Sequence, residues 1–176
     1  MMLVLAYDLR RSGGIERLSL QVLRALDGLG IQHRVVGTQR LGPGWIGRQL
    51  GRCWFVLQLL WWLPQAKAVF SMHVLLLRPL RLCDRWGITP KGQLRYCWLH
   101  GIEVWGSHLE DVCSDLFRCT ALAASSSFTA GQVQSKIGLM PPITVVHPCI
   151  AITEQPPPRN QIVEGDHWGR LQLLTV

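Results

Sequence analysis

The sequence predicts an α/β fold, a Rossmann-like parallel sheet with helices on both faces. Short apolar runs typical of strands alternate along the chain with longer segments of helical periodicity. Gly and Pro residues separate these segments, and repeated β-α units require parallel strands joined by right-handed crossovers. The 176 residues, 48% of them hydrophobic, amount to about one domain with a sizeable core.

The first half of the chain begins with a buried strand at 2–7. A helix follows, because apolar residues recur every three or four positions from Ile15 to Leu29. The pattern then predicts strands at 33–37 and 68–72 and helices at 46–63 and 74–86, the last despite Pro79.

The second half continues the alternation. Thr129 and Gln132 have the spacing of a capping box, with Ser127 as an alternative N-cap of the same helix. The predicted elements here are strands at 94–99, 121–124 and 143–146 and helices at 107–118 and 128–137.

The composition divides the chain into three parts. Residues 1–151 carry the repeated β-α units and form the predicted domain. Residues 152–169, which include three consecutive prolines, read as an interdomain linker. Residues 170–176 are again apolar and predict the first strand of a second domain.

Charge and cysteine content restrict the function classes. Lys and Arg outnumber Asp and Glu by 18 to 11, and this balance favours anionic partners such as phosphate esters or acidic lipids. The arginines are scattered and no nucleic-acid-binding motif is present, so we expect no nucleic acid partner. The six cysteines lack C-x-x-C spacing, which predicts free buried thiols in a reducing compartment and no metal site. The N-terminus lacks the features of a signal peptide, so we expect a cytoplasmic location.

A glycine pair between the first strand and the first helix comes closest to chemistry. Gly13 and Gly14 lack Cβ atoms, can adopt positive φ, and precede a helix whose free N–H groups and dipole favour a phosphate. The alternative is an ordinary tight turn. The motif is Ser12-Gly13-Gly14-Ile15-Glu16-Arg17.

Five segments in order resemble the amino-terminal domain of family 4 glycosyltransferases, which have the two-domain GT-B fold. The resemblance covers about residues 2–151 plus the stub at 170–176. Its segments are the first strand with Gly13-Gly14-Ile15-Glu16-Arg17, Phe70-Ser71-Met72-His73, Leu99-His100-Gly101-Ile102-Glu103, Ala124-Ser125-Ser126-Ser127-Phe128-Thr129, and Val146-His147-Pro148-Cys149-Ile150.

The resemblance implies retaining transfer of a sugar from a nucleoside-diphosphate sugar, without a further cofactor, to a lipid-linked or polysaccharide acceptor. This chain would supply the acceptor-side half and be inactive alone, since the family's donor-binding glutamate pair belongs to the second domain. Gly13 and Gly14 would approach the donor diphosphate, and His100 and Gly101 would lie near the transferred sugar. Ser127 and Thr129 would lie close by.

Two further side chains keep alternatives open. Glu103 could orient an acceptor hydroxyl or simply cap the next element. His73 also ends a strand, where a ligand contact and a packing role are both open.

Two other functions compete with the enzyme. A non-catalytic remnant or interaction module could keep the same fold. A dinucleotide-dependent oxidoreductase fits less well, because the glycines lack G-x-G-x-x-G spacing and no acidic residue follows the second strand at the expected distance.

The helix at 46–63 offers two faces, and its apolar stretch from Cys53 to Leu63 is too short to cross a bilayer. Leu50, Leu57 and Trp61 form one face, which we expect to pack on the sheet. A second face would either be core or contact an anionic membrane at the cytoplasmic surface, in the manner of an interfacial helix. The residues of this second face are Phe55, Leu59 and Trp62, with Arg48 and Arg52 one turn earlier.

Overall fold

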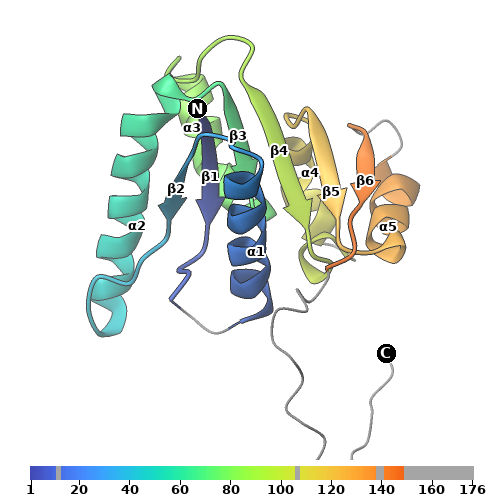
Figure 1. Ribbon diagram of the computed structural model, residues 1–176, viewed down its shortest axis with the longest axis horizontal. Helices are drawn as coiled ribbons and strands as arrows, with labels where there is room; N and C mark the ends of the chain where they lie inside the picture. The colour runs from blue at the N-terminus through green and yellow to red at the C-terminus, as the bar shows by residue number, and fades with distance from the viewer. Residues whose placement is uncertain (11–12, 106–107, 138–140, 149–176) are drawn as a thin grey trace, which may run out of the picture.

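The computed structural model describes residues 1–10, 13–105, 108–137 and 141–148. Within them lies one six-stranded sheet in which all neighbouring strands are parallel (Figure 1). The α/β fold with a parallel sheet is therefore confirmed. The strands are β1 (Met2–Ala6), β2 (His33–Gly37), β3 (Ala68–Ser71), β4 (Leu94–Leu99), β5 (Ala121–Ala124) and β6 (Ile143–Val145). The helices are α1 (Gly14–Gly28), α2 (Gly44–Trp62), α3 (Arg78–Arg85), α4 (His108–Leu116) and α5 (Ser127–Ile137), with 3-10 turns η1 (Leu63–Gln65), η2 (Val74–Leu77) and η3 (Ile102–Val104).

The order of the strands creates a topological switch point. The sheet runs β2-β1-β3-β4-β5-β6, so β1 lies between β2 and β3. The chain moves one way from β1 to β2 and the opposite way from β2 to β3. In open parallel sheets ligands bind outside the carboxyl ends of the strands at such a point. The fold therefore places a candidate site where β1 and β3 end.

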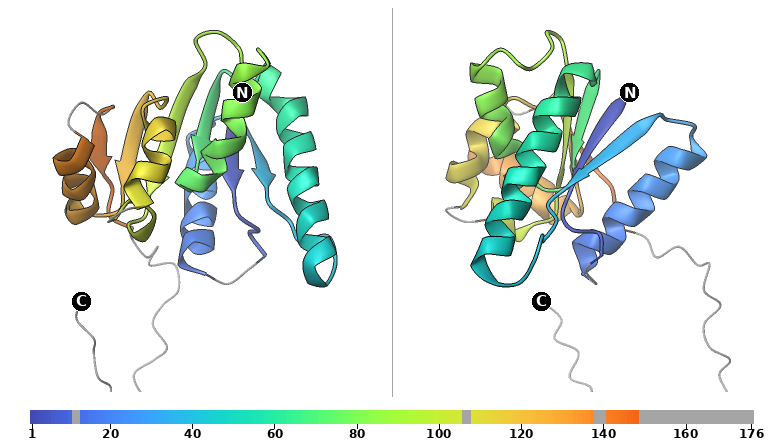
Figure 2. Two further views of the ribbon diagram at one scale, coloured as in Figure 1. Left: turned by 180° about the vertical axis from the view of Figure 1, so that it is seen from behind. Right: turned by 90° about the vertical axis from the view of Figure 1, so that its left-hand side faces the viewer.

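Helices cover both faces of the sheet (Figure 2). Alternating residues of the strands pack against them in two separate clusters. On one face Val4 and Ala6 belong to a cluster with Leu18 and Leu26 of α1. The opposite face carries a larger cluster to which α2, α3 and α4 contribute. The two-residue period of β1 explains this, since Leu3 and Leu5 point to the larger cluster. Helices on both faces, as predicted, are confirmed.

The starts of α3 and α5 differ from the prediction for local chemical reasons. Pro79 lies in the first turn of α3, where a missing N–H costs nothing, and the segment predicted as one helix at 74–86 forms η2 at 74–77 and α3 at 78–85. The N-cap of α5 is neither predicted candidate. The Ser126 hydroxyl oxygen accepts from the Thr129 backbone N–H at 3.1 Å, which satisfies one of the free donors of the helix start.

The two faces of α2 are reversed relative to the prediction. Phe55 and Leu59 are only 3% and 0% exposed and belong to the core, against which Trp62 also packs. These residues therefore cannot provide a lipid-facing surface. Trp61, expected on the sheet, is 70% exposed, and the other residues on its side of the helix are exposed as well: Ile46, Leu50, Trp54 and Leu57.

Two glycines explain why this stripe of α2 turns inward. Gly47 and Gly51 are buried one turn apart on the same stripe as Phe55. A Cβ at Gly51 would lie 1.7 Å from the Gln39 carbonyl oxygen, and one at Gly47 would lie 2.1 Å from the Gly42 oxygen. The chain between β2 and α2 therefore lies directly against the helix.

The predicted linker at 152–169 and the apolar run at 170–176 lie outside the described residues.

The cysteines differ in how deeply they are buried. Burial raises the pKa of the Cys119 thiol to about 12, and the buried Cys97 thiol also has a raised pKa, so both are unreactive. Cys53 is exposed, contrary to the prediction of buried thiols, because it lies on the outer side of α2.

Candidate functional site

Three ring-bearing side chains meet at the switch point. Tyr7 follows β1, His73 follows β3 and His100 follows β4. The ring centroids of Tyr7 and His73 are 5.1 Å apart, and those of His73 and His100 are 6.1 Å apart with the rings inclined by 24°. The structure therefore brings together the two predicted histidines, which are 27 residues apart in the sequence.

The hydrogen bonds of His100 fix its tautomer. Its Nε2 lies 2.7 Å from the Met72 carbonyl oxygen, and because a carbonyl only accepts, Nε2 carries the proton. In the neutral ring Nδ1 is then an acceptor. No hydrogen bond to Nδ1 is found among the described residues, so its lone pair is available to a ligand hydroxyl.

His73 has the opposite tautomer. Its Nδ1 accepts from the Leu75 backbone N–H at 3.2 Å and caps η2, which leaves the proton on Nε2 in the neutral ring. Burial lowers the pKa of His73, and the nearby His100 acts in the same direction, while Glu103 opposes them. His73 is therefore neutral at neutral pH. The cluster offers one imidazole as acceptor and one as donor.

Glu103 braces the turn that presents His100. Its two carboxylate oxygens accept from the backbone N–H groups of His100, at 2.5 Å, and Gly101, at 3.1 Å. Gly101 has φ +146°, a conformation that residues with a Cβ rarely adopt. The capping alternative for Glu103 is thus the one that the contacts support. It positions the catalytic candidate His100.

The glycine pair does not use the backbone freedom that the sequence suggested. Gly13 is extended at φ −140° and ψ 168°, and Gly14 begins α1 without a positive φ. A Cβ on Gly14 would meet nothing within 4 Å, whereas one on Gly13 would meet the Glu16 carboxylate. Neither glycine adopts the positive φ that it could, because the turn into α1 needs only extended backbone. Gly14 still faces open space at the start of α1, where a ligand could approach the backbone.

The turn before α5 divides its two predicted residues. Ser127 is exposed, whereas Thr129 is fully buried with its hydroxyl 3.0 Å from that of Ser126. Thr129 therefore belongs to the helix cap and presents no surface to a ligand, which corrects its assignment. Phe128 is exposed and packs edge-on against Trp105, at a centroid distance of 5.4 Å.

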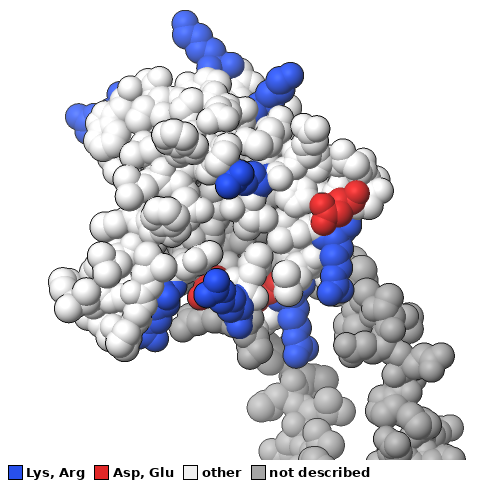
Figure 3. Space-filling view, turned by 60° about the vertical axis from the view of Figure 1, so that its left-hand side comes forward, with Lys and Arg blue, Asp and Glu red and all other residues white. Residues whose placement is uncertain are grey.

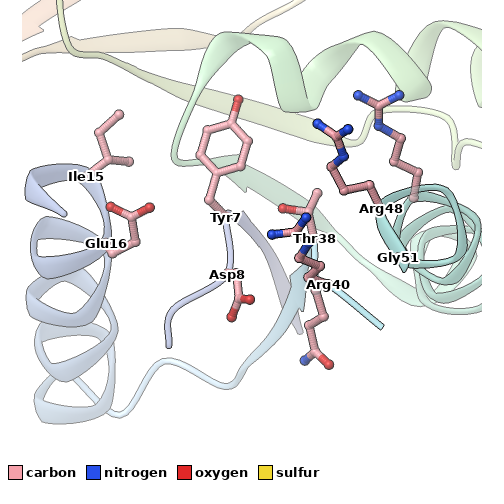
Figure 4. Close-up of a pocket in the computed structure, with 10 residues that line it drawn as sticks. Tyr7, Asp8, Ile15, Glu16, Thr38, Arg40, Arg48 and Gly51 are labelled. Atoms are coloured by element: carbon pink, nitrogen blue, oxygen red, sulfur yellow. The ribbon is translucent and has the colours of Figure 1, made fainter. Parts of the chain in front are cut away.

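A pocket of about 560 Å³ adjoins Tyr7 and lies between the start of α1 and the start of α2 (Figure 4). Arg48 and Arg52, which the sequence assigned to a membrane contact, line this pocket together with Arg40. Tyr7 and Arg40 were missed by the sequence reasoning. The signal for Tyr7 was its place directly after the first strand, while nothing local distinguished Arg40 from other loop arginines.

No three His, Cys, Asp or Glu side chains of the described residues lie close enough to hold a metal ion. None of the helices in the same part of the chain is long and apolar enough to span a membrane.

The sheet and its helices form a Rossmann-like fold. Solved structures that share it are those of Anabaena HepE in complex with UDP and glucose, with UDP-glucose, and with UDP. The first gives a TM-score of 0.51 at 15% identity, the second 0.51 at 14%, and the third 0.50 at 14%. Each covers 83% of this chain and 43% of the HepE chain, so this chain spans less than half of HepE.

At this identity the likeness shows the fold. No model of a protein family matches the sequence. A search of curated protein sequences gives no match either.

Proposed function

We propose that this chain is the acceptor-side domain of a nucleotide-sugar glycosyltransferase of the family 4 type. The observation that carries the proposal is the pair of histidines at the switch point of a glycosyltransferase-like sheet. The solved neighbour HepE binds UDP and UDP-glucose, which supports a nucleotide sugar as the donor. A second, donor-binding domain would complete the enzyme, and this chain alone would be inactive.

The proposed reaction moves the sugar to an acceptor hydroxyl with retention of its anomeric configuration. The acceptor is a lipid-linked or polysaccharide glycan. His100 Nδ1 would accept a hydrogen bond from a hydroxyl of the reacting sugar, and His73 Nε2 would donate one. The start of α1 beside Gly14 would contribute part of the stabilisation of the leaving diphosphate.

The coding sequence downstream of Val176 provides the first test. The proposal expects an open frame that continues into a second Rossmann-like domain with two glutamates spaced by seven residues. A stop codon there would favour the alternative, a non-catalytic remnant or interaction module of the same fold.

The second test is His100→Ala in the longest natural form of the protein, assayed for sugar transfer from UDP-glucose. We expect kcat to fall by roughly 10²-fold or more, the size found when a positioned polar group is removed from a reacting centre. His33→Ala is the matched control. His33 begins β2, so it lies at the edge of the sheet away from the candidate site, and its ring is hydrogen-bonded locally to the Ile31 carbonyl. Unchanged kinetics in the His100 variant would refute the assignment.

The proposed location is the cytoplasm, with peripheral attachment to the inner face of the membrane. Since Phe55 and Leu59 are buried, such an attachment would use the opposite side of α2. The exposed Trp54, Leu57 and Trp61 lie on that side.

A further inference from the structure

The pocket beside Tyr7 has two walls of opposite character. Arg48 and Arg52 come from the first turns of α2, and Arg40 comes from the chain that lies against this helix. Glu16 and Asp8 line the side formed by α1 and the end of β1. Figure 4 shows Tyr7 between these walls, with Glu16 on one side and Arg40 and Arg48 on the other.

The arginine wall carries positive charge that is not taken up by ion pairs within the described residues. Among the described residues the ion pairs with carboxylates involve other basic groups, and none involves Arg40, Arg48 or Arg52. The face shown in Figure 3 likewise carries more Lys and Arg than Asp and Glu. Guanidinium groups that line one wall of a pocket bind phosphate well, because their N–H groups match phosphate oxygens.

The fold itself brings the three arginines together. Gly47 and Gly51 let residues 39–42 lie against α2, and this contact sets Arg40 beside Arg48 and Arg52. The arrangement therefore depends on these two glycines. A larger residue at either position would push α2 away from residues 39–42.

The opposite wall suits hydroxyl groups. Ionised carboxylates such as those of Glu16 and Asp8 only accept hydrogen bonds, so they favour a hydroxyl and disfavour a second phosphate. The pocket volume of about 560 Å³ falls in the range of small-molecule sites. Tyr7, which lines the pocket, places its hydroxyl 3.4 Å from His73 Nδ1, so Tyr7 links the pocket to the histidine cluster.

We propose that this pocket binds a phosphorylated sugar or polyol, with the phosphate on Arg40, Arg48 and Arg52 and the hydroxyls toward Glu16 and Asp8. The inference rests on the proposed function, and it makes this ligand the acceptor, a phosphorylated one in place of the polysaccharide named there, with its free hydroxyl toward Tyr7. The phosphate is carried either by a soluble sugar or by a lipid headgroup.

Calorimetric titration of the 176-residue chain tests the proposal, with glucose 1-phosphate as the soluble probe. Vesicles of phosphatidylcholine with and without phosphatidylinositol form the lipid arm. Saturable binding in either arm is expected, it weakens as salt is raised, and the tighter arm identifies the source of the phosphate.

Arg48→Gln and Arg52→Gln should each weaken binding roughly tenfold, the effect of losing one charge-assisted contact. Arg24→Gln removes the same charge from α1 outside the pocket and should leave affinity unchanged. Arg24, Arg48 and Arg52 are all exposed, so thermal unfolding should confirm that the three variants fold.

Three results would overturn the assignment. The first is no saturable binding in either arm, and the second is equal weakening in the Arg24 variant. The third is displacement by UDP at lower concentration than glucose 1-phosphate with the same dependence on Arg48 and Arg52, which would make this a donor site. These arms need no sugar transfer, so a failure of transfer with intact binding counts against the proposed function alone.

Discussion

At the scale of single residues, complementary tautomers distinguish the two histidines of the site. A backbone carbonyl holds the proton on Nε2 of His100, and a backbone N–H holds the lone pair on Nδ1 of His73. Both partners are main-chain groups of the segment from Met72 to Leu75. One loop thus sets the donor and acceptor pattern of the whole cluster.

Glu103 is the side chain that holds His100 in place, and its replacement gives the first prediction at this scale. In Glu103→Gln the amide NH₂ would face one of the two backbone N–H groups, leaving that donor without an acceptor. We expect a loss of roughly 1–3 kcal/mol in the free energy of unfolding, measured by urea denaturation. Glu110→Gln, an exposed position on α4, serves as the control and should change little. Equal effects in both variants would contradict the bracing role.

At the scale of elements, α2 is positioned by what its glycines permit. Gly51→Ala would place a Cβ 1.7 Å from the Gln39 carbonyl oxygen, which must then move. The expected loss of unfolding free energy is about 1–3 kcal/mol, the usual cost of overpacking. Gly131→Ala on α5 is the matched control, since its Cβ meets nothing within 4 Å and alanine favours a helix by about 0.5–1 kcal/mol. A stabilised Gly51 variant would refute the close packing.

The two sides of α2 give a second prediction at this scale. Phe55→Ala removes a core side chain and should cost about 3 kcal/mol or more in thermal or urea unfolding. Trp61→Ala, on the exposed side, should change stability by less than about 0.5 kcal/mol. A larger loss of stability in the Trp61 variant than in the Phe55 variant would mean that Phe55, Leu59 and Trp62 form the outer face.

At the scale of the whole molecule, Asp84 links elements that are distant in sequence. Its carboxylate accepts from Arg95 Nη1 of β4 at 2.8 Å and from Arg118 Nη1, after α4, at 2.9 Å. Burial alone would raise the pKa of Asp84, but hydrogen bonds from Arg95 and Thr89 and the Arg95 charge outweigh it and lower the pKa to about 2. A second pair, Arg81 with the buried Asp115, joins α3 to α4.

The lowered pKa predicts how stability depends on pH. Because the folded pKa lies below the ordinary value of 3.8, the contribution of Asp84 is present above that value and is lost as pH falls toward about 2. Asp84→Asn should therefore cost about 2 kcal/mol at neutral pH, and the difference from the wild type should shrink below about pH 4. Urea unfolding across this range measures it, with the exposed Asp111→Asn as control. If the difference in unfolding free energy between the wild type and Asp84→Asn does not depend on pH, the contribution of Asp84 is not ionic.

The sequence by itself determined the fold class and the elements, because local periodicity and turn residues carry that information. The strands at 33–37, 94–99 and 121–124 match the structure residue for residue. It also singled out His73 and His100, since a polar side chain directly after a buried strand must lie at the carboxyl edge of a parallel sheet.

Only the tertiary structure decided which face of α2 is buried, because the helix is apolar nearly all round and its sequence pattern does not favour one face. The decision came from a contact across the fold, in which Gly47 and Gly51 accept the chain from Gln39 to Gly42. The sequence assigned Arg48 and Arg52 to a membrane contact, but the same packing contact places them in the wall of a pocket. Charge convergence of this kind depends on distances between elements, and a linear pattern does not contain those distances.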